Sequence, residues 1–179
     1  MNVQELSDIM LGDLPAKREK WYELLKDDVF KPTYNFATWD ATREDPFEKF
    51  KKVRDAKMVS VTNFKDDPHN IFTAHEFLAM VDPSLAIKFT VQFNLFGGSI
   101  FALSTKRHEK YFKTIDTLET MGCFCLTELG YGNNAAEMET TVTYDASTKE
   151  FVVNCPSTLS QKYWISNGFK HANTSVVFG

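Results

Sequence analysis

The sequence has few cysteines and no excess of positive charge. Its three cysteines, Cys123, Cys125 and Cys155, are an odd number without the spacing of a disulfide framework. We therefore expect reduced thiols in an intracellular compartment. With 20 Lys and Arg against 24 Asp and Glu, the net charge is −4. This balance leaves no basic field to attract phosphate backbones, so we expect no nucleic-acid partner.

Complete metal and nucleophile motifs are also missing. Cys123-x-Cys125 is half of a metal site, but no second Cys or His pair completes it, and two residues on one face of a strand are the simpler interpretation. We expect no bound metal. No histidine has a nucleophile beside it in the sequence, so each is expected at the surface or at a helix cap. The histidines are His69, His75, His108 and His171.

Targeting and membrane segments are not visible either. The N-terminus, MNVQELSDIMLGDLP, carries acids where a signal peptide needs a basic flank and an apolar run. The longest apolar stretch, 85–103, contains Lys88, Gln92 and Asn94, which make a membrane span too costly. It is expected to be a core helix or helix pair. The last residues, NTSVVFG, resemble a strand interrupted in mid-course, without a targeting tripeptide, so we expect an incomplete chain.

Helical patterns dominate residues 1–120. The 43% of hydrophobic residues, 14% aromatic, suffice for the core of one domain or slightly more. Apolar spacing, helix-start prolines and capping residues predict a helical bundle. The expected helices are 3–11, one from Asp13-Leu14-Pro15 to about Lys26, one from Asp45-Pro46, 69–81, one from Asp82-Pro83, and one from Thr105 to Leu118. Residues 27–43 are expected to be an irregular connection.

From about residue 121 the pattern is typical of strands. GCFCLTE alternates, residues 139–155 predict a hairpin, and QKYWISN and NTSVVF supply two further strand candidates. Helices followed by strands indicate an α+β fold. We expect two units: an N-terminal α-helical domain at 1–120, and at 121–179 the incomplete beginning of an antiparallel β-domain.

The glycine motifs do not indicate a phosphate loop. Gly130-x-Gly132 lacks the third glycine and the following helix of a dinucleotide fingerprint, and no Lys-Ser/Thr pair completes a Walker loop. Gly97-Gly98 lies in the helical part, where close helix packing is the favoured interpretation and ligand contact remains the alternative.

A family resemblance covers residues 95–178. The segments that carry it are LFGG, T-K-RH-x-K-YF, GCFCLTELGYG, ETTVTYD and KYWISNG, in this order. Together they resemble the acyl-CoA oxidases, peroxisomal flavoenzymes allied to the acyl-CoA dehydrogenases. Residues 1–94 fit the helical N-terminal part of that family with weaker motifs. The resemblance implies an acyl-CoA dehydrogenase-like fold of which this chain is the N-terminal portion.

The resemblance also implies a binding site for FAD. Phe124, Leu126 and Thr127 would form one wall against the isoalloxazine ring, and Gly130 would let the loop pass it. A second wall would come from the WIS segment, with Trp164 near the ring, Ile165 beside it, and the Ser166 hydroxyl directed to flavin N5. Gly132 and Asn133 would lie toward the acyl thioester.

The implied reaction is the conversion of fatty acyl-CoA to trans-2-enoyl-CoA in fatty-acid β-oxidation, with O₂ reduced to H₂O₂. Glu128 is not expected to be the catalytic base, because the family's base lies in a C-terminal helical domain that this sequence does not contain. The fragment alone is thus expected to be inactive, and the parent to be a peroxisomal homodimer. Tyr131 and Asn133 depart from the histidine and the small hydroxyl residue usual in oxidases, which implies altered contacts.

Two alternatives stay open. The parent could be an acyl-CoA dehydrogenase that uses an electron-transfer flavoprotein, although the T-E-P and G-S-D elements expected there are replaced by TELGYGNN. The chain could also be a non-enzymatic remnant that acts as a binding or interaction protein.

Overall fold

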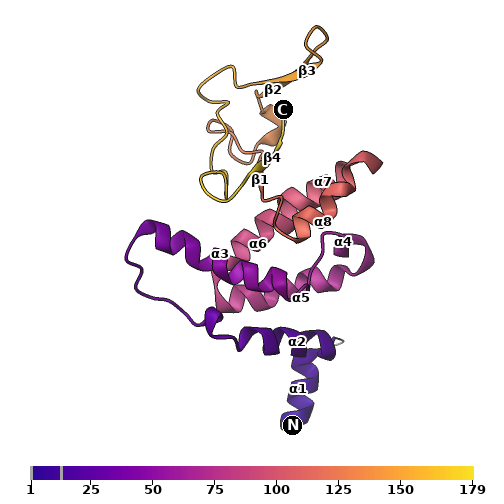
Figure 1. The fold of residues 1–179 in the computed structure, drawn as a ribbon, viewed down its shortest axis with the longest axis vertical. Coiled ribbons are helices and arrows are strands. Elements are labelled where there is room, and N and C mark those ends of the chain that lie inside the picture. Colours follow the sequence, from indigo (N-terminus) through magenta and orange to yellow (C-terminus); the bar gives the residue numbers. More distant parts are fainter. Residues whose placement is uncertain (1, 13) are drawn as a thin grey trace.

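The computed structural model describes residues 2–12 and 14–179, so Asp13, part of one predicted helix start, lies outside the described residues. Helices occupy one part of the elongated molecule and the strands lie beyond them at the C-terminal end (Figure 1). The helices are α1 (Val3–Leu11), α2 (Pro15–Leu25), α3 (Trp39–Asp55), α4 (Asn63–Asp66), α5 (Pro68–Val81), α6 (Pro83–Phe89), α7 (Gly98–Leu103) and α8 (Lys110–Asp116).

The predicted helix from Asp82-Pro83 is confirmed and continues through a π-helical segment, Thr90–Gly97, into α7. Asp82 caps it by accepting hydrogen bonds from the Ser84 and Leu85 amides. In the described part of the chain, Pro83–Leu103 is the one helix that is long and apolar enough to cross a membrane. Length and composition alone are weak evidence, since core helices meet the same criteria, and 39% of its 18-residue window is buried.

Helix α3 begins earlier than predicted. The expected start at Asp45-Pro46 is wrong, because Thr38 Oγ1 accepts a hydrogen bond from the Ala41 amide at 3.1 Å and starts the helix at Trp39. Pro46 therefore lies inside the helix, where it removes one backbone donor but is itself buried. The irregular connection predicted at 27–43 is correspondingly shorter, and it includes a 3₁₀ turn at Asp28–Phe30.

The helices enclose an aromatic core. Trp21, Phe50, Phe77, Phe89 and Phe96 are fully buried in it. Glycine allows the long helix to approach its neighbours, because a Cβ at Gly97 would lie 3.1 Å from a Val61 methyl and 2.9 Å from the Gln92 carbonyl oxygen. This confirms the helix-packing interpretation of that glycine.

Among the described residues, four strands form two small sheets. The predicted hairpin is confirmed as β2 (Thr141–Asp145) antiparallel to β3 (Glu150–Asn154). Strand β1 (Gly122–Cys125) pairs with β4 (Thr174–Val177) in parallel, from Gly122 opposite Thr174 to Cys125 opposite Val177. This pair therefore differs from the antiparallel arrangement that we expected, although the α+β class is as predicted.

The predicted strand at QKYWISN does not form. Lys162 makes a single bridge with Glu128, and the chain then turns, because Trp164 and Asn167 have positive φ angles of 62° and 66°. Such angles are incompatible with an extended strand.

Candidate functional site

The first predicted wall of the site is hydrogen-bonded to the segment that leads into the second. Residues 126–130 follow β1, and residues 159–163 run beside them. The Tyr163 amide donates to the Thr127 carbonyl oxygen at 3.0 Å, and the Leu129 amide donates to the Gln161 carbonyl oxygen at 2.9 Å. A third bond, from the Gly130 amide to the Leu159 carbonyl oxygen, is also 2.9 Å long. The fold thus brings residues 127–129 (TEL) next to Tyr163, the first residue of the YWIS segment at 163–166.

Gly130 is required by this close approach. A Cβ at that position would lie 2.7 Å from the Leu159 Cβ, which is shorter than real Cβ contacts. The glycine therefore lets the two chain segments touch. Gly132 has a different role, since its φ of 54° needs a residue without a Cβ penalty, and the space around it is open.

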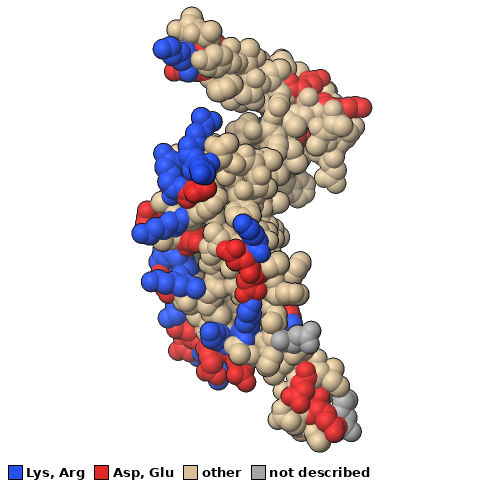
Figure 2. Space-filling view, turned by 90° about the vertical axis from the view of Figure 1, so that its right-hand side faces the viewer, with Lys and Arg blue, Asp and Glu red and all other residues tan. Residues whose placement is uncertain are grey.

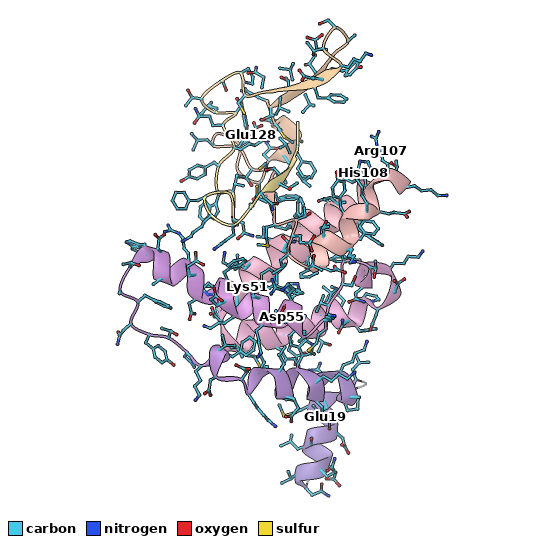
Figure 3. All side chains as sticks on the ribbon, viewed as in Figure 1. Glu19, Lys51, Asp55, Arg107, His108 and Glu128 are labelled. Carbon is cyan, nitrogen blue, oxygen red and sulfur yellow. The ribbon has the colours of Figure 1, made fainter. Side chains whose placement is uncertain are left out.

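Glu128 joins three segments at this site, in the strand-containing part of the molecule (Figure 3). Its carboxylate is 2% exposed and accepts hydrogen bonds from the Glu139 and Thr140 amides, each at 2.9 Å, and from the Thr140 hydroxyl. The Lys162 ammonium lies 3.1 Å away. Burial would raise the pKa of Glu128, but these donors, Thr140 first, outweigh it and lower the pKa to about 2. Glu128 is therefore an ionised cross-link.

Tyr131 is held in the same network. Its hydroxyl donates to Glu139, and this hydrogen bond is the main cause that raises the pKa of Tyr131 to about 12. The Tyr131 and Gly132 amides both donate to the Glu128 carbonyl oxygen, at 3.2 and 3.1 Å. The turn that carries Gly132 and the exposed Asn133 is thereby fixed to the end of β1.

Two predicted site residues present unused hydroxyl groups. Thr127 and Ser166 are half-buried, and neither hydroxyl makes a hydrogen bond within the described part of the chain. Phe124 lies on β1 with its ring 4.8 Å from that of Phe178, and Leu126 offers its carbonyl oxygen to Lys162 at 3.0 Å. The residues that were predicted to hydrogen-bond a flavin are therefore free to do so.

Trp164 has the most unusual conformation at the site. Its φ is 62°, which is a rare angle for a bulky L-residue, and 82% of its surface is exposed. Such strain is typical of functional sites. An exposed, strained aromatic side chain next to free hydroxyls fits the stacking surface that a flat ring system needs.

Ile165 and Ser166 line a pocket of about 240 Å³ together with Lys88, Asn167 and His171. Sites that enclose a complete ligand commonly have about 300–1,000 Å³. This pocket is therefore smaller than a site that encloses a complete ligand. Figure 2 shows charged side chains of both signs gathered mainly along one edge of the helical part.

Sequence reasoning missed Gln92 as a site-supporting residue. It is fully buried in the π-helical segment, and its amide donates to the Ile115 and Thr120 carbonyl oxygens at 3.1 and 2.7 Å. Its Oε1 accepts from the Gly122 amide at 2.9 Å, which fixes the start of β1 on the helices. The signal was a polar residue among buried aromatic positions, which must find partners inside the core.

Comparisons with known proteins point to one family. No family model matches. The chain is 42% identical over 127 residues to "Acyl-coenzyme A oxidase 2, peroxisomal" of Arabidopsis thaliana, covering 70% of this chain and 18% of that protein. A solved structure of acyl-CoA oxidase3 from Yarrowia lipolytica aligns with a TM-score of 0.76 and 27% identity over 93% of this chain and 24% of that one.

A third comparison shows the fold alone. A solved structure of acyl-CoA oxidase-2 from Caenorhabditis elegans, bound with FAD, ascaroside-CoA and ATP, aligns with a TM-score of 0.56 at 19% identity, over 92% of this chain and 25% of that one. The chain thus spans between about a fifth and a quarter of these proteins.

Proposed function

Because this chain is related in sequence and fold to the acyl-CoA oxidases over most of its own length, we propose that it is part of an FAD-dependent acyl-CoA oxidase. The enzyme would convert fatty acyl-CoA to trans-2-enoyl-CoA in β-oxidation, with O₂ as electron acceptor. Relatives are named peroxisomal, which supports the same location for the parent. We propose a homodimeric parent.

The observation that supports this proposal is that residues 159–163, which lead into the predicted second wall, are hydrogen-bonded to residues 127–130. The strained, exposed Trp164 follows directly on the segment that is hydrogen-bonded to Thr127. FAD, when bound, supplies the hydride acceptor and passes the electrons to O₂ to give H₂O₂. In this arrangement Thr127 and Ser166 would donate hydrogen bonds to the flavin edge, and Trp164, with Ile165, Phe124 and Leu126 as flanking residues, would exclude water from the ring.

This chain alone would be inactive. The buried carboxylate of the site, Glu128, already accepts from two amides, a hydroxyl and Lys162, so it is poorly suited to remove the α-proton of the substrate. The base, the rest of the cofactor cleft and the dimer surface would belong to the remainder of the parent. The turn with Gly130, Gly132 and Asn133 would lie toward the acyl thioester.

The decisive experiment compares the 179-residue chain with the protein translated from its complete reading frame. We expect the longer protein to bind FAD and to consume O₂ with stoichiometric H₂O₂ when given a long-chain acyl-CoA. The 179-residue chain should bind FAD weakly or not at all and show no turnover. Tight flavin binding with turnover by the short chain would refute the assignment of the base to the missing part.

The electron acceptor separates the oxidase from its alternative. Reoxidation of the substrate-reduced longer protein only by an added electron-transfer flavoprotein would reassign it to the dehydrogenases. A stop codon directly after Gly179, with no downstream helical domain, would instead favour a non-enzymatic binding protein.

A further inference from the structure

The loop from Trp164 to His171 contains three non-glycine residues with left-handed backbone conformation. Trp164, Asn167 and His171 have φ angles of 62°, 66° and 78°. Residues other than glycine rarely adopt this conformation, and a tryptophan does so least readily of the three. A loop of this kind keeps its shape only where surrounding contacts enforce it.

Lys88 of α6 supplies such contacts from the helical part. Its ammonium donates to Asn167 Oδ1 and to His171 Nδ1, each at 3.1 Å. Both acceptors are neutral, and no carboxylate of the described residues lies within ion-pair distance of this lysine. Burial is the main cause that lowers the pKa of Lys88. The partly buried Lys88 ammonium therefore donates both of these hydrogen bonds to the same loop.

Helix α3 holds the same loop from a second direction. The His171 ring stacks on Phe47 with 4.0 Å between ring centroids, and His171 Nε2 lies 3.1 Å from Glu44 Oε1. Because Nδ1 accepts from Lys88, the neutral ring must carry its proton on Nε2 and donate it to Glu44. Two helices therefore fix one histidine in a single protonation state.

We propose that Lys88 and neutral His171 are positioning residues that hold the Trp164–Ser166 wall in its strained conformation. The inference rests on the proposed function in so far as this wall is expected to contact a flavin. A proton added at Nδ1 would point an N–H group at the Lys88 ammonium. Protonation of His171 would therefore remove one of the two hydrogen bonds that Lys88 of α6 gives to this loop, and the wall would be held less firmly.

The charges around His171 favour its neutral form. Burial lowers its pKa most, and Lys88 from α6 and Lys170 from its own loop lower it further. Glu44 from α3 raises the pKa of His171, but the same carboxylate also forms an ion pair with Lys170 at 2.6 Å. Arg43 of α3 is a further positive charge that lines the pocket beside His171. Because the folded pKa lies below the ordinary value of 6.5, the hydrogen bond from Lys88 to His171 is complete above pH 6.5 and is lost as the pH falls through the lower, folded value.

The test uses the 179-residue chain without flavin. NMR titration of the His171 ring, identified by its loss in His171→Asn, would give its pKa, and amide hydrogen exchange would report the order of residues 164–172. We expect Lys88→Met to raise the His171 pKa and to speed exchange in this loop by at least about fivefold, as for a lost buried hydrogen bond. Lys106→Met, at an exposed lysine, should change neither.

His171→Asn separates positioning from general stability. Asparagine keeps a neutral acceptor for Lys88 and tolerates positive φ, so the loop should stay protected at pH 7.5 but lose the pH dependence seen in the wild type. Unchanged exchange and an unchanged His171 pKa in Lys88→Met would overturn the inference, as would a retained pH dependence in His171→Asn. Since this test uses no flavin, either result would leave the proposed function standing. Failure of the longer protein to bind FAD would overturn the proposed function but not the role of Lys88 and His171 in the loop.

Discussion

At the residue scale, Glu128 shows how an acid in a predicted site can serve structure. Its folded pKa of about 2 lies below the ordinary 4.5, so its stabilising effect is complete above pH 4.5 and is lost as the pH falls from 4.5 to 2. Glu128→Gln would place the side-chain NH₂ group of glutamine next to the Glu139 and Thr140 amides and the Lys162 ammonium, which are all donors. We expect a lower urea midpoint at pH 7 and a difference from wild type that shrinks below pH 4.5.

Circular dichroism at several pH values would measure these midpoints. Glu150→Gln is the matched control, because Glu150 is exposed on β3 and should leave the midpoint unchanged. A difference between Glu128→Gln and wild type that stays constant down to pH 2 would contradict the assigned ionisation.

The two free hydroxyl groups give a second prediction at this scale. In the longer enzyme, Thr127→Val and Ser166→Ala should each weaken FAD binding or slow flavin reduction while the protein stays folded. A lost hydrogen bond of about 1 kcal/mol corresponds to roughly a fivefold change in the dissociation constant. Thr143→Val on the exposed hairpin is the control. Wild-type flavin content and reduction rate in both site variants would refute the flavin contacts.

At the element scale, the adjacent glycines of the long helix should respond oppositely to alanine. The added Cβ at Gly97 would crowd Val61 and the Gln92 carbonyl, which should cost about 1–3 kcal/mol. At Gly98 the nearest atoms are 3.5 Å away and φ is −61°, so alanine should stabilise the helix by about 0.5–1 kcal/mol. Thermal unfolding of the two variants tests this, and equal shifts would show that the helix packs differently.

The same scale shows what the sequence could and could not predict. The hairpin and the helix after Asp82 were predictable, because alternation, turn residues and capping act over a few neighbouring positions. The parallel pairing of β4 with β1 was not, since it joins residues far apart in the chain. The left-handed backbone at Trp164 was equally hidden, because YWIS has the residue types of a strand and no neighbouring residue signals a positive φ at a tryptophan.

At the scale of the whole molecule, the buried aromatic residues of the described chain all lie in the helical part. The strand near the end of the chain, β4, has a neighbour, because it pairs with β1. The unpartnered surface lies on the hairpin instead. One face of it carries the directly paired residues Val142 with Val153 and Tyr144 with Phe151, which are between 41% and 67% exposed.

This face leads to the prediction that the 179-residue chain self-associates through β2 and β3. A two-stranded hairpin with an apolar face is marginally stable alone and recruits further chains. Sedimentation velocity should show a mass that rises with concentration, and Phe151→Lys should shift the chain toward the monomer. Val152→Lys adds the same charge on the opposite face, beside Thr143, and should have the smaller effect. A wild-type chain that is monomeric at all concentrations, or equal effects of the two lysines, would show that this apolar face is not the contact surface.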